Sequence, residues 1–142
     1  MEKEIIKNDI KVLAIRVGSF PDGITETFNK LVDLVGWGDG REIFGISHGS
    51  KDGIVYYSAA NEKFEGEAEQ LNFVQLTIPA GTYAALRIDG WREKLDSIGQ
   101  AFCQLMQDPE FDQVTPCIEW YKNADVMVCM VRLNTPVLQT SI

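Results

Sequence analysis

The chain has 142 residues, a length typical of one compact domain. Its 13 basic and 21 acidic residues give a formal net charge of -8, which repels phosphate backbones and anionic lipids. We therefore expect neither nucleic acid nor a membrane among its direct partners. The N-terminal segment, MEKEIIKNDI, lacks the apolar core of a signal peptide or an anchor, and no stretch is long enough to span a bilayer. The sequence predicts a cytoplasmic protein.

Cysteine and histidine usage bears on redox and metal chemistry. Cys103, Cys117 and Cys129 form no close pair and lie in apolar surroundings, so we expect reduced core thiols rather than disulfides or metal ligands. His48 is the only histidine, which removes most histidine-based metal sites. No nucleophile elbow surrounds the serines beside it. The sequence predicts no metal and no cofactor.

In chain order, the first half predicts a strand, a helix and two strands. Alternating residues predict the strand over 11–18, and apolar residues at steps of four, three and four predict a helix over 24–36. The glycine-rich segment 36–40 then leads into strands over 42–49 and 53–60. This segment lacks the lysine and the strand–helix context of a phosphate loop, and we interpret it as a connection.

The second half repeats this order. Strands are predicted over 72–78 and 82–89, joined by a turn at 79–81. Apolar residues at steps of three, four and three predict a second helix over 91–107. A two-stranded hairpin over 115–131 closes the pattern.

Together these elements predict a single α+β domain over residues 1–142, built from two β-α-β-β units at about 1–70 and 71–142. The acidic segment 61–70 is interpreted as the connection between them. Two helices cannot cover both faces of so wide a sheet, so we expect both on one face of an antiparallel sheet, with the other face left as a groove. An exposed sheet edge could also support a homodimer, although nothing in the chain requires one.

The first strand of the closing hairpin, CIEWY, carries a carboxylate among aromatic and aliphatic residues. Alternation places Cys117, Glu119 and Tyr121 on one face, and Ile118 and Trp120 on the other. A carboxylate that loses its hydration needs a partner, and a cation would supply one. That face therefore suits a ligand that is both charged and flat. The alternative is that Glu119 accepts a hydrogen bond from a tyrosine or backbone group and only holds the fold.

Aromatic side chains are the second group of candidates, because their rings attract cations and bury flat apolar groups. Trp37, in the glycine-rich segment, and Trp91, at the start of the second helix, need not pack a core and are candidate pocket lids. Of the adjacent Tyr56 and Tyr57, one should face any groove. The candidate ligand-binding residues are Glu119, Tyr121, Trp91, Tyr57, Tyr83, Trp37, Phe20 and Trp120.

Three short motifs, taken together, resemble a known family. They are Ile78–Ala84 (IPAGTYA), Ile88–Gly90 (IDG) and Pro116–Tyr121 (PCIEWY). Their order and spacing are similar to those of GyrI-like small-molecule (effector) binding domains, which also form the C-terminal parts of AraC-family and MerR-family multidrug regulators. The likeness spans nearly the whole chain. It departs from the pattern at Asp89, where the family often has a histidine or another polar residue, and no helix-turn-helix precedes residue 1.

The resemblance implies a duplicated α+β unit with a central ligand groove on its pseudo-symmetry axis and an acidic residue at the base. By motif position that residue is Glu119, which in the multidrug-regulator relatives pairs with lipophilic cations. We therefore expect a stand-alone effector-binding domain for cationic or amphipathic organic molecules, acting as a regulator-like sensor or a drug-sequestering protein without its own DNA-binding domain, rather than an enzyme.

Two alternatives stay open. Some relatives hydrolyse reactive electrophiles, and Glu119 with Tyr121 could serve as base and acid. The gyrase-inhibiting relatives instead bind a protein, which an acidic surface could favour.

Overall fold

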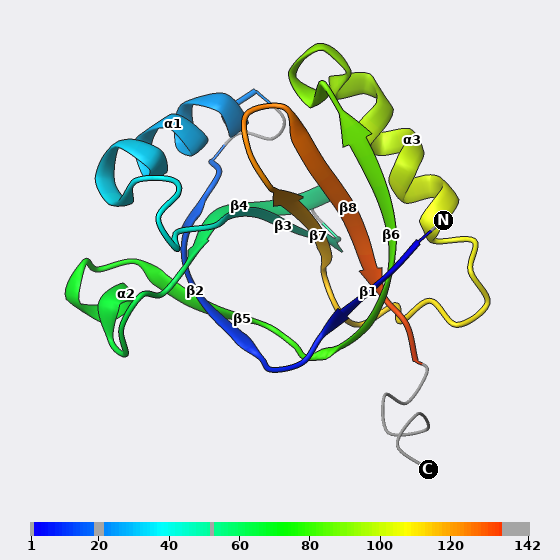
Figure 1. Cartoon of the computed structure of the whole chain (residues 1–142), viewed down its shortest axis with the longest axis horizontal. Coiled ribbons are helices and arrows are strands. Elements are labelled where there is room, and N and C mark those ends of the chain that lie inside the picture. Colours follow the sequence, from blue (N-terminus) through cyan, green and yellow to red (C-terminus); the bar gives the residue numbers. More distant parts are fainter. Residues whose placement is uncertain (1, 19–21, 52, 135–142) are drawn as a thin grey trace. The chain divides into compact units, whose positions relative to one another are not determined.

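The computed structural model describes residues 2–18, 22–51 and 53–134 (Figure 1). Its strands pair in antiparallel fashion and its helices lie between them in the chain. The predicted α+β class with antiparallel strands is confirmed. None of the helices in the described ranges is both long and apolar enough to cross a membrane.

The chain divides into two compact units. The central unit holds residues 10–78, and the terminal unit holds the residues before 10 and after 78. In the central unit the strands pair in the order β3, β4, β2, β5, and α1 packs on β4 and β2. Its elements are β2 (Ile10–Arg16), α1 (Ile24–Val35), β3 (Ile43–Ser50), β4 (Gly53–Asn61), α2 (Glu67–Gln70) and β5 (Val74–Ile78).

The terminal unit repeats this arrangement. Its strands pair in the order β7, β8, β6, β1, and α3 packs on β8 and β6. Its elements are β1 (Glu2–Ile6), β6 (Gly81–Asp89), the 3₁₀ turn η1 (Trp91–Glu93), α3 (Leu95–Leu105), β7 (Cys117–Tyr121) and β8 (Val126–Arg132). The sequence β6, α3, β7, β8 thus matches β2, α1, β3, β4.

The outer strand of each unit comes from the other half of the sequence. β1 precedes β2 in the chain but pairs with β6, from Glu2 opposite Ala85 to Ile6 opposite Gly81. β5 precedes β6 but pairs with β2, from Val74 opposite Ala14. The boundaries between the units therefore follow Asp9 and Ile78. The two repeats expected in the sequence, at about 1–70 and 71–142, are a different division of the chain and stay a prediction.

Two predicted elements differ from the structure. The second helix begins at Leu95 rather than at residue 91, because Gly90 takes a left-handed conformation with φ of 66° and Lys94 leaves helical geometry with φ of -129°. The segment 61–70, expected as a turn-like connection between the two halves, contains the short helix α2. α1 agrees with its prediction: Leu31 of the apolar stripe is fully buried, and the helix ends at Val35 with Gly36 as its C-terminal cap.

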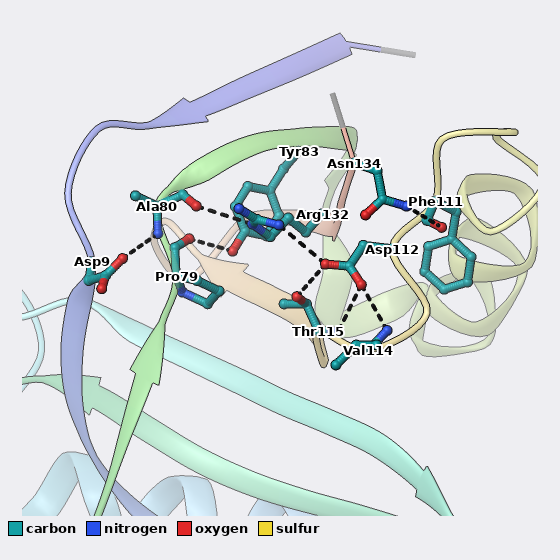
Figure 2. Close-up of polar contacts among 10 residues, drawn as sticks. All are labelled: Asp9, Pro79, Ala80, Tyr83, Phe111, Asp112, Val114, Thr115, Arg132 and Asn134. Carbon is teal, nitrogen blue, oxygen red and sulfur yellow. Dashed lines mark hydrogen bonds and ion pairs between the residues drawn. The ribbon is translucent and has the colours of Figure 1, made fainter. Parts of the chain in front are cut away.

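The IPAG motif is explained by a polar network in the terminal unit (Figure 2). The Tyr83 hydroxyl donates to the Pro79 carbonyl at 2.7 Å, and Arg132 Nε donates to the Ala80 carbonyl at 3.1 Å. Asp112 in turn accepts from Arg132 Nη1 at 3.3 Å. A β-carbon at Gly81 would lie 2.7 Å from Arg132 Nε, so a side chain there would displace this guanidinium, and the backbone φ of 152° also favours glycine.

In the central unit, α2 is held by a buried ion pair. Arg41 Nη1 and Nη2 donate to the two carboxylate oxygens of Glu67 at 2.9 and 2.7 Å, and both side chains are almost fully buried. Arg41 Nη1 also donates to the Asn61 carbonyl at 2.6 Å. The hydrogen bonds from Arg41, opposed by burial, hold the pKa of Glu67 below its usual 4.5.

We predict that Glu67→Ala lowers the free energy of unfolding by about 3–5 kcal/mol, because it leaves a buried guanidinium without its carboxylate. Since the folded pKa of Glu67 is lowered, the contribution of the pair is complete above pH 4.5 and is lost as the pH falls through the folded pKa. Urea denaturation at several pH values measures this. The variant should show a shallower acid loss than the wild type, and Glu69→Ala, exposed on the same helix, should change little. Equal effects of the two substitutions would contradict the assignment.

Gly81→Ala should destabilise the chain by about 1–3 kcal/mol, because the added methyl overlaps the Arg132 guanidinium and φ is 152°. Gly49→Ala is the matched control, since its β-carbon meets nothing within 4 Å and its φ is not positive. Thermal unfolding of both variants compares them. A Gly81 variant as stable as the control would show that the turn tolerates a side chain.

Candidate functional site

Glu119 and Tyr121 form a buried pair on one face of β7. Glu119 is 8% exposed and lies opposite Cys129 of β8 in the strand register. The Tyr121 hydroxyl donates a hydrogen bond to Glu119 Oε1. Because residues two apart in a strand share a face, the local sequence alone places this donor beside the carboxylate. The carboxylate thus lies beside a phenol, as expected from the alternation.

Trp91 joins this pair from another element. Its ring centroid lies 4.8 Å from that of Tyr121, with the two planes inclined by 62°. The indole Nε1 donates to the Asn123 carbonyl at 3.1 Å, and the Gly90 amide donates to the Asp125 carbonyl at 2.6 Å. These bonds tie the η1 turn to the loop between β7 and β8. Glu119, Tyr121 and Trp91 together are the acid–aromatic cluster.

Two thiols share the face of the carboxylate. Burial, and secondarily the charge of Glu119, raises the pKa of Cys117 to about 11. Burial followed by the same charge also raises the pKa of Cys129. Both thiols are therefore protonated at neutral pH and add no second negative charge beside Glu119. Cys103, in contrast, is exposed on α3, which corrects the expectation that all three cysteines lie in the core. Among the residues that the structure describes, no group of three or more histidine, cysteine or acidic side chains could hold a metal ion.

Trp120 lies apart from the acid–aromatic cluster, on the opposite face of β7. The Lys122 ammonium group makes a cation–π contact with its ring, because Lys122 Nζ lies 3.2 Å from the ring centroid. Lys122 Nζ also lies 3.7 Å from Glu4 Oε1. Sequence reasoning missed Lys122, although it lies only two residues from Trp120, just after the end of β7.

The other expected ligand residues have different surroundings. Tyr83 is fully buried, its hydroxyl is bonded to Pro79 (Figure 2), and burial raises its pKa to about 12. In the central unit, the Trp37 ring lies edge-on to Phe28 of α1 at 5.5 Å. Tyr57 is half-buried on β4. Phe20 lies outside the described residues. The structure brings together three of the eight expected residues, and the roles of all eight in binding stay a prediction.

Comparisons with known proteins bear on the fold. No sequence family matches the chain, and no curated protein sequence matches it. An integron cassette protein of Vibrio cholerae superposes with a TM-score of 0.67 at 15% identity, covering 93% of this chain and 94% of that one. SAV2435, solved with bound tetraphenylphosphonium, gives 0.61 at 13% identity over 98% and 97%. The C-terminal domain of EcmrR gives 0.59 at 15% identity over 93% and 94%. At these identities the likeness shows a shared fold.

We predict that Tyr121→Phe destabilises the chain by about 1–3 kcal/mol, because a buried carboxylate loses a hydrogen-bond donor. In the Glu119→Gln background the same substitution should have a smaller effect, since the charged acceptor is gone. Urea denaturation of the wild type, both single variants and the double variant measures this coupling. Strictly additive losses of stability would mean that the two side chains do not act as a pair.

Proposed function

We propose that the chain is a GyrI-like effector-binding domain that takes a lipophilic organic cation at the acid–aromatic cluster. Glu119 supplies the counter-charge, and Trp91 and Tyr121 supply aromatic surface. The observation that supports this most directly is a buried carboxylate that accepts a hydrogen bond from the hydroxyl of Tyr121, whose ring in turn contacts the ring of Trp91. In this proposal the chain acts as a regulator-like sensor or a sequestering protein.

The electrostatics favour a cation. Tyr121 gives Glu119 a hydrogen bond from a neutral group, whereas an organic cation would add a charge–charge interaction in surroundings of low dielectric. Desolvation of the two ions offsets part of this gain. A lipophilic cation with a delocalised charge suits the site better than a strongly hydrated one, because it loses less hydration on entry.

The aromatic rings favour a ligand with flat apolar groups. A ring attracts a cation by roughly 0.5–2 kcal/mol, and burial of apolar area adds to this. Trp91 and Glu119 are each only 8% exposed, so a ligand must displace covering groups as it enters. Hydrogen bonds hold Trp91 and Gly90 to the loop between β7 and β8, so the entry of a ligand beneath Trp91 would have to break or shift them.

The comparisons support this choice of ligand class. SAV2435, which shares the fold, was solved with tetraphenylphosphonium, a lipophilic organic cation. EcmrR, whose C-terminal domain shares the fold, was also solved in a complex with DNA. We include a role in transcription regulation in the proposal. We also propose that the sequence contains two repeats and that the protein is cytoplasmic.

The hydrogen bond between Tyr121 and Glu119 also favours a second candidate, hydrolysis of reactive electrophiles. The carboxylate would activate a water molecule, and the phenol would donate a proton to the leaving group. The two functions differ in the fate of the ligand, because an enzyme consumes it and a sensor releases it unchanged.

We predict saturable binding of tetraphenylphosphonium, measured by quenching of tryptophan fluorescence and by calorimetry. Glu119→Gln should weaken this binding by about tenfold or more, because it removes the counter-charge and keeps the shape. Glu4→Gln is the matched control, since Glu4 pairs with Lys122 rather than with Tyr121. Triphenylphosphine oxide, a neutral analogue, should bind weakly to every form.

Absence of saturable binding, or equal affinities of the Glu119 and Glu4 variants, would remove the proposal. Incubation with a p-nitrophenyl ester and an epoxide then separates the two candidates. Turnover that Glu119→Gln and Tyr121→Phe both abolish would favour the hydrolase.

A further inference from the structure

Trp91 joins the acid–aromatic cluster from a turn that is weak by itself. The turn η1 has three residues, and a 3₁₀ turn has poorer hydrogen-bond geometry than an α-helix. Gly90 before it is left-handed, and Lys94 after it has a φ of -129°, so the turn does not continue directly into α3. The Trp91 side chain therefore needs contacts from outside η1 to keep its position.

Some contacts of Trp91 stay inside the turn. The Arg92 guanidinium carbon lies 5.1 Å from the centroid of the Trp91 ring, and the Glu93 amide donates to the Gly90 carbonyl at 3.1 Å. Arg92 and Glu93 belong to the same turn as Trp91, so neither contact fixes the turn to the sheet. Contacts with other elements have to do this.

The loop between β7 and β8, residues 122–125, supplies such contacts. The Asn123 carbonyl accepts from Trp91 Nε1 at 3.1 Å. The Asp125 carbonyl accepts from the amides of Gly90 and Trp91 at 2.6 and 3.3 Å. One loop thus holds the indole of Trp91 and the backbone of its turn at the same time.

The side chain of Asn123 shapes this loop. Its Oδ1 accepts from the amides of Asp125 and Val126, both at 2.8 Å. An asparagine oxygen that bonds to the backbone two residues on closes a turn of the Asx type. The amides of Lys122 and Asn123 also donate to the Val126 carbonyl, at 2.9 and 3.2 Å. The Asn123 side chain therefore helps to fix the direction of the two carbonyls that hold η1.

We propose that Asn123 is a positioning residue for the acid–aromatic cluster, which holds Trp91 against Tyr121 and so limits the entry of a ligand to Glu119. The inference rests on the proposed function for the ligand class, an organic cation. Asn123 acts through the carbonyls of the loop and through Trp91, and it needs no contact with the ligand itself.

This arrangement makes ligand entry depend on an opening step. Trp91 and Glu119 are both almost fully buried, so the closed form hides the carboxylate. Opening breaks the bonds between the loop and η1, and their donors and acceptors then turn to water. A ligand that binds only the open form is slowed by the small fraction of protein that is open. A looser loop should therefore raise the association rate.

Asn123→Ala should loosen the turn in the ligand-free protein. The chain has three tryptophans, so NMR gives three indole N–H signals, and Trp91→Phe assigns one of them. Hydrogen exchange of the Trp91 signal should be about threefold to tenfold faster in Asn123→Ala, because the bonds that order its acceptor are lost. Exchange of the Trp37 signal, in the central unit, should not change. This separates local opening from a loss of stability of the whole chain.

Two variants control this measurement. Asn123→Asp keeps an oxygen that accepts from the same amides and should restore slow exchange at Trp91. Asn134→Ala is the matched control, since Asn134 is also exposed in the terminal unit but donates to the Phe111 carbonyl. Unchanged exchange at Trp91 in Asn123→Ala, an equal effect of Asn134→Ala, or failure of Asn123→Asp to restore slow exchange would overturn the proposal.

Stopped-flow fluorescence with tetraphenylphosphonium measures entry. The association rate constant should rise by about threefold to tenfold in Asn123→Ala, because more of the protein is open. Glu119→Gln should act mainly on the dissociation rate, because it removes a contact made after entry. An unchanged association rate in a variant whose Trp91 exchanges faster would show that Asn123 does not control entry.

The two measurements separate this inference from the proposed function. Faster exchange at Trp91 in Asn123→Ala, in a chain that does not bind tetraphenylphosphonium, would support the hold of Asn123 on Trp91 and remove the proposed ligand. Binding of tetraphenylphosphonium with wild-type exchange in Asn123→Ala would support the proposed function and overturn the role of Asn123.

Discussion

The buried carboxylate of Glu119 is the constraint around which the terminal unit is arranged. Removing a carboxylate from water is unfavourable unless hydrogen bonds or charges replace the lost hydration. The chain supplies a phenol two residues along the same strand, and it places protonated thiols and an indole around the pair. The proposed function depends on this carboxylate, because a cationic ligand with aromatic groups would match both its charge and the rings beside it.

The Ile78–Ala84 motif, one of the three that resemble the GyrI-like domains, stabilises the fold and contributes no residue to the acid–aromatic cluster. Tyr83 and Gly81 are both committed to the turn before β6, where the Pro79 and Ala80 carbonyls accept from Tyr83 and Arg132. Glu119 takes no part in this turn, and it is the residue to which the proposed function assigns the binding of a cation. The Ile78–Ala84 motif therefore has a structural role, whereas the Pro116–Tyr121 motif carries two residues of the proposed site.

The two units follow one plan with different details. Each takes its outer strand from the other half of the sequence, which ties the halves together through backbone hydrogen bonds. The central unit holds α2 with the buried pair of Arg41 and Glu67. The terminal unit carries the acid–aromatic cluster. The two units thus share one order of strands and helix, and their side chains differ.

Local patterns in the sequence determined α1, the body of α3, most strands and the face of β7 that carries Glu119 and Tyr121, because helical period and strand alternation depend only on neighbours along the chain. Tertiary structure alone decided that Trp91 lies against Tyr121, since this depends on hydrogen bonds from a loop 32 residues away. It also decided that β1 pairs with β6 and that Tyr83 is buried. Strand partners and burial arise from contacts between distant segments, and no local period encodes them.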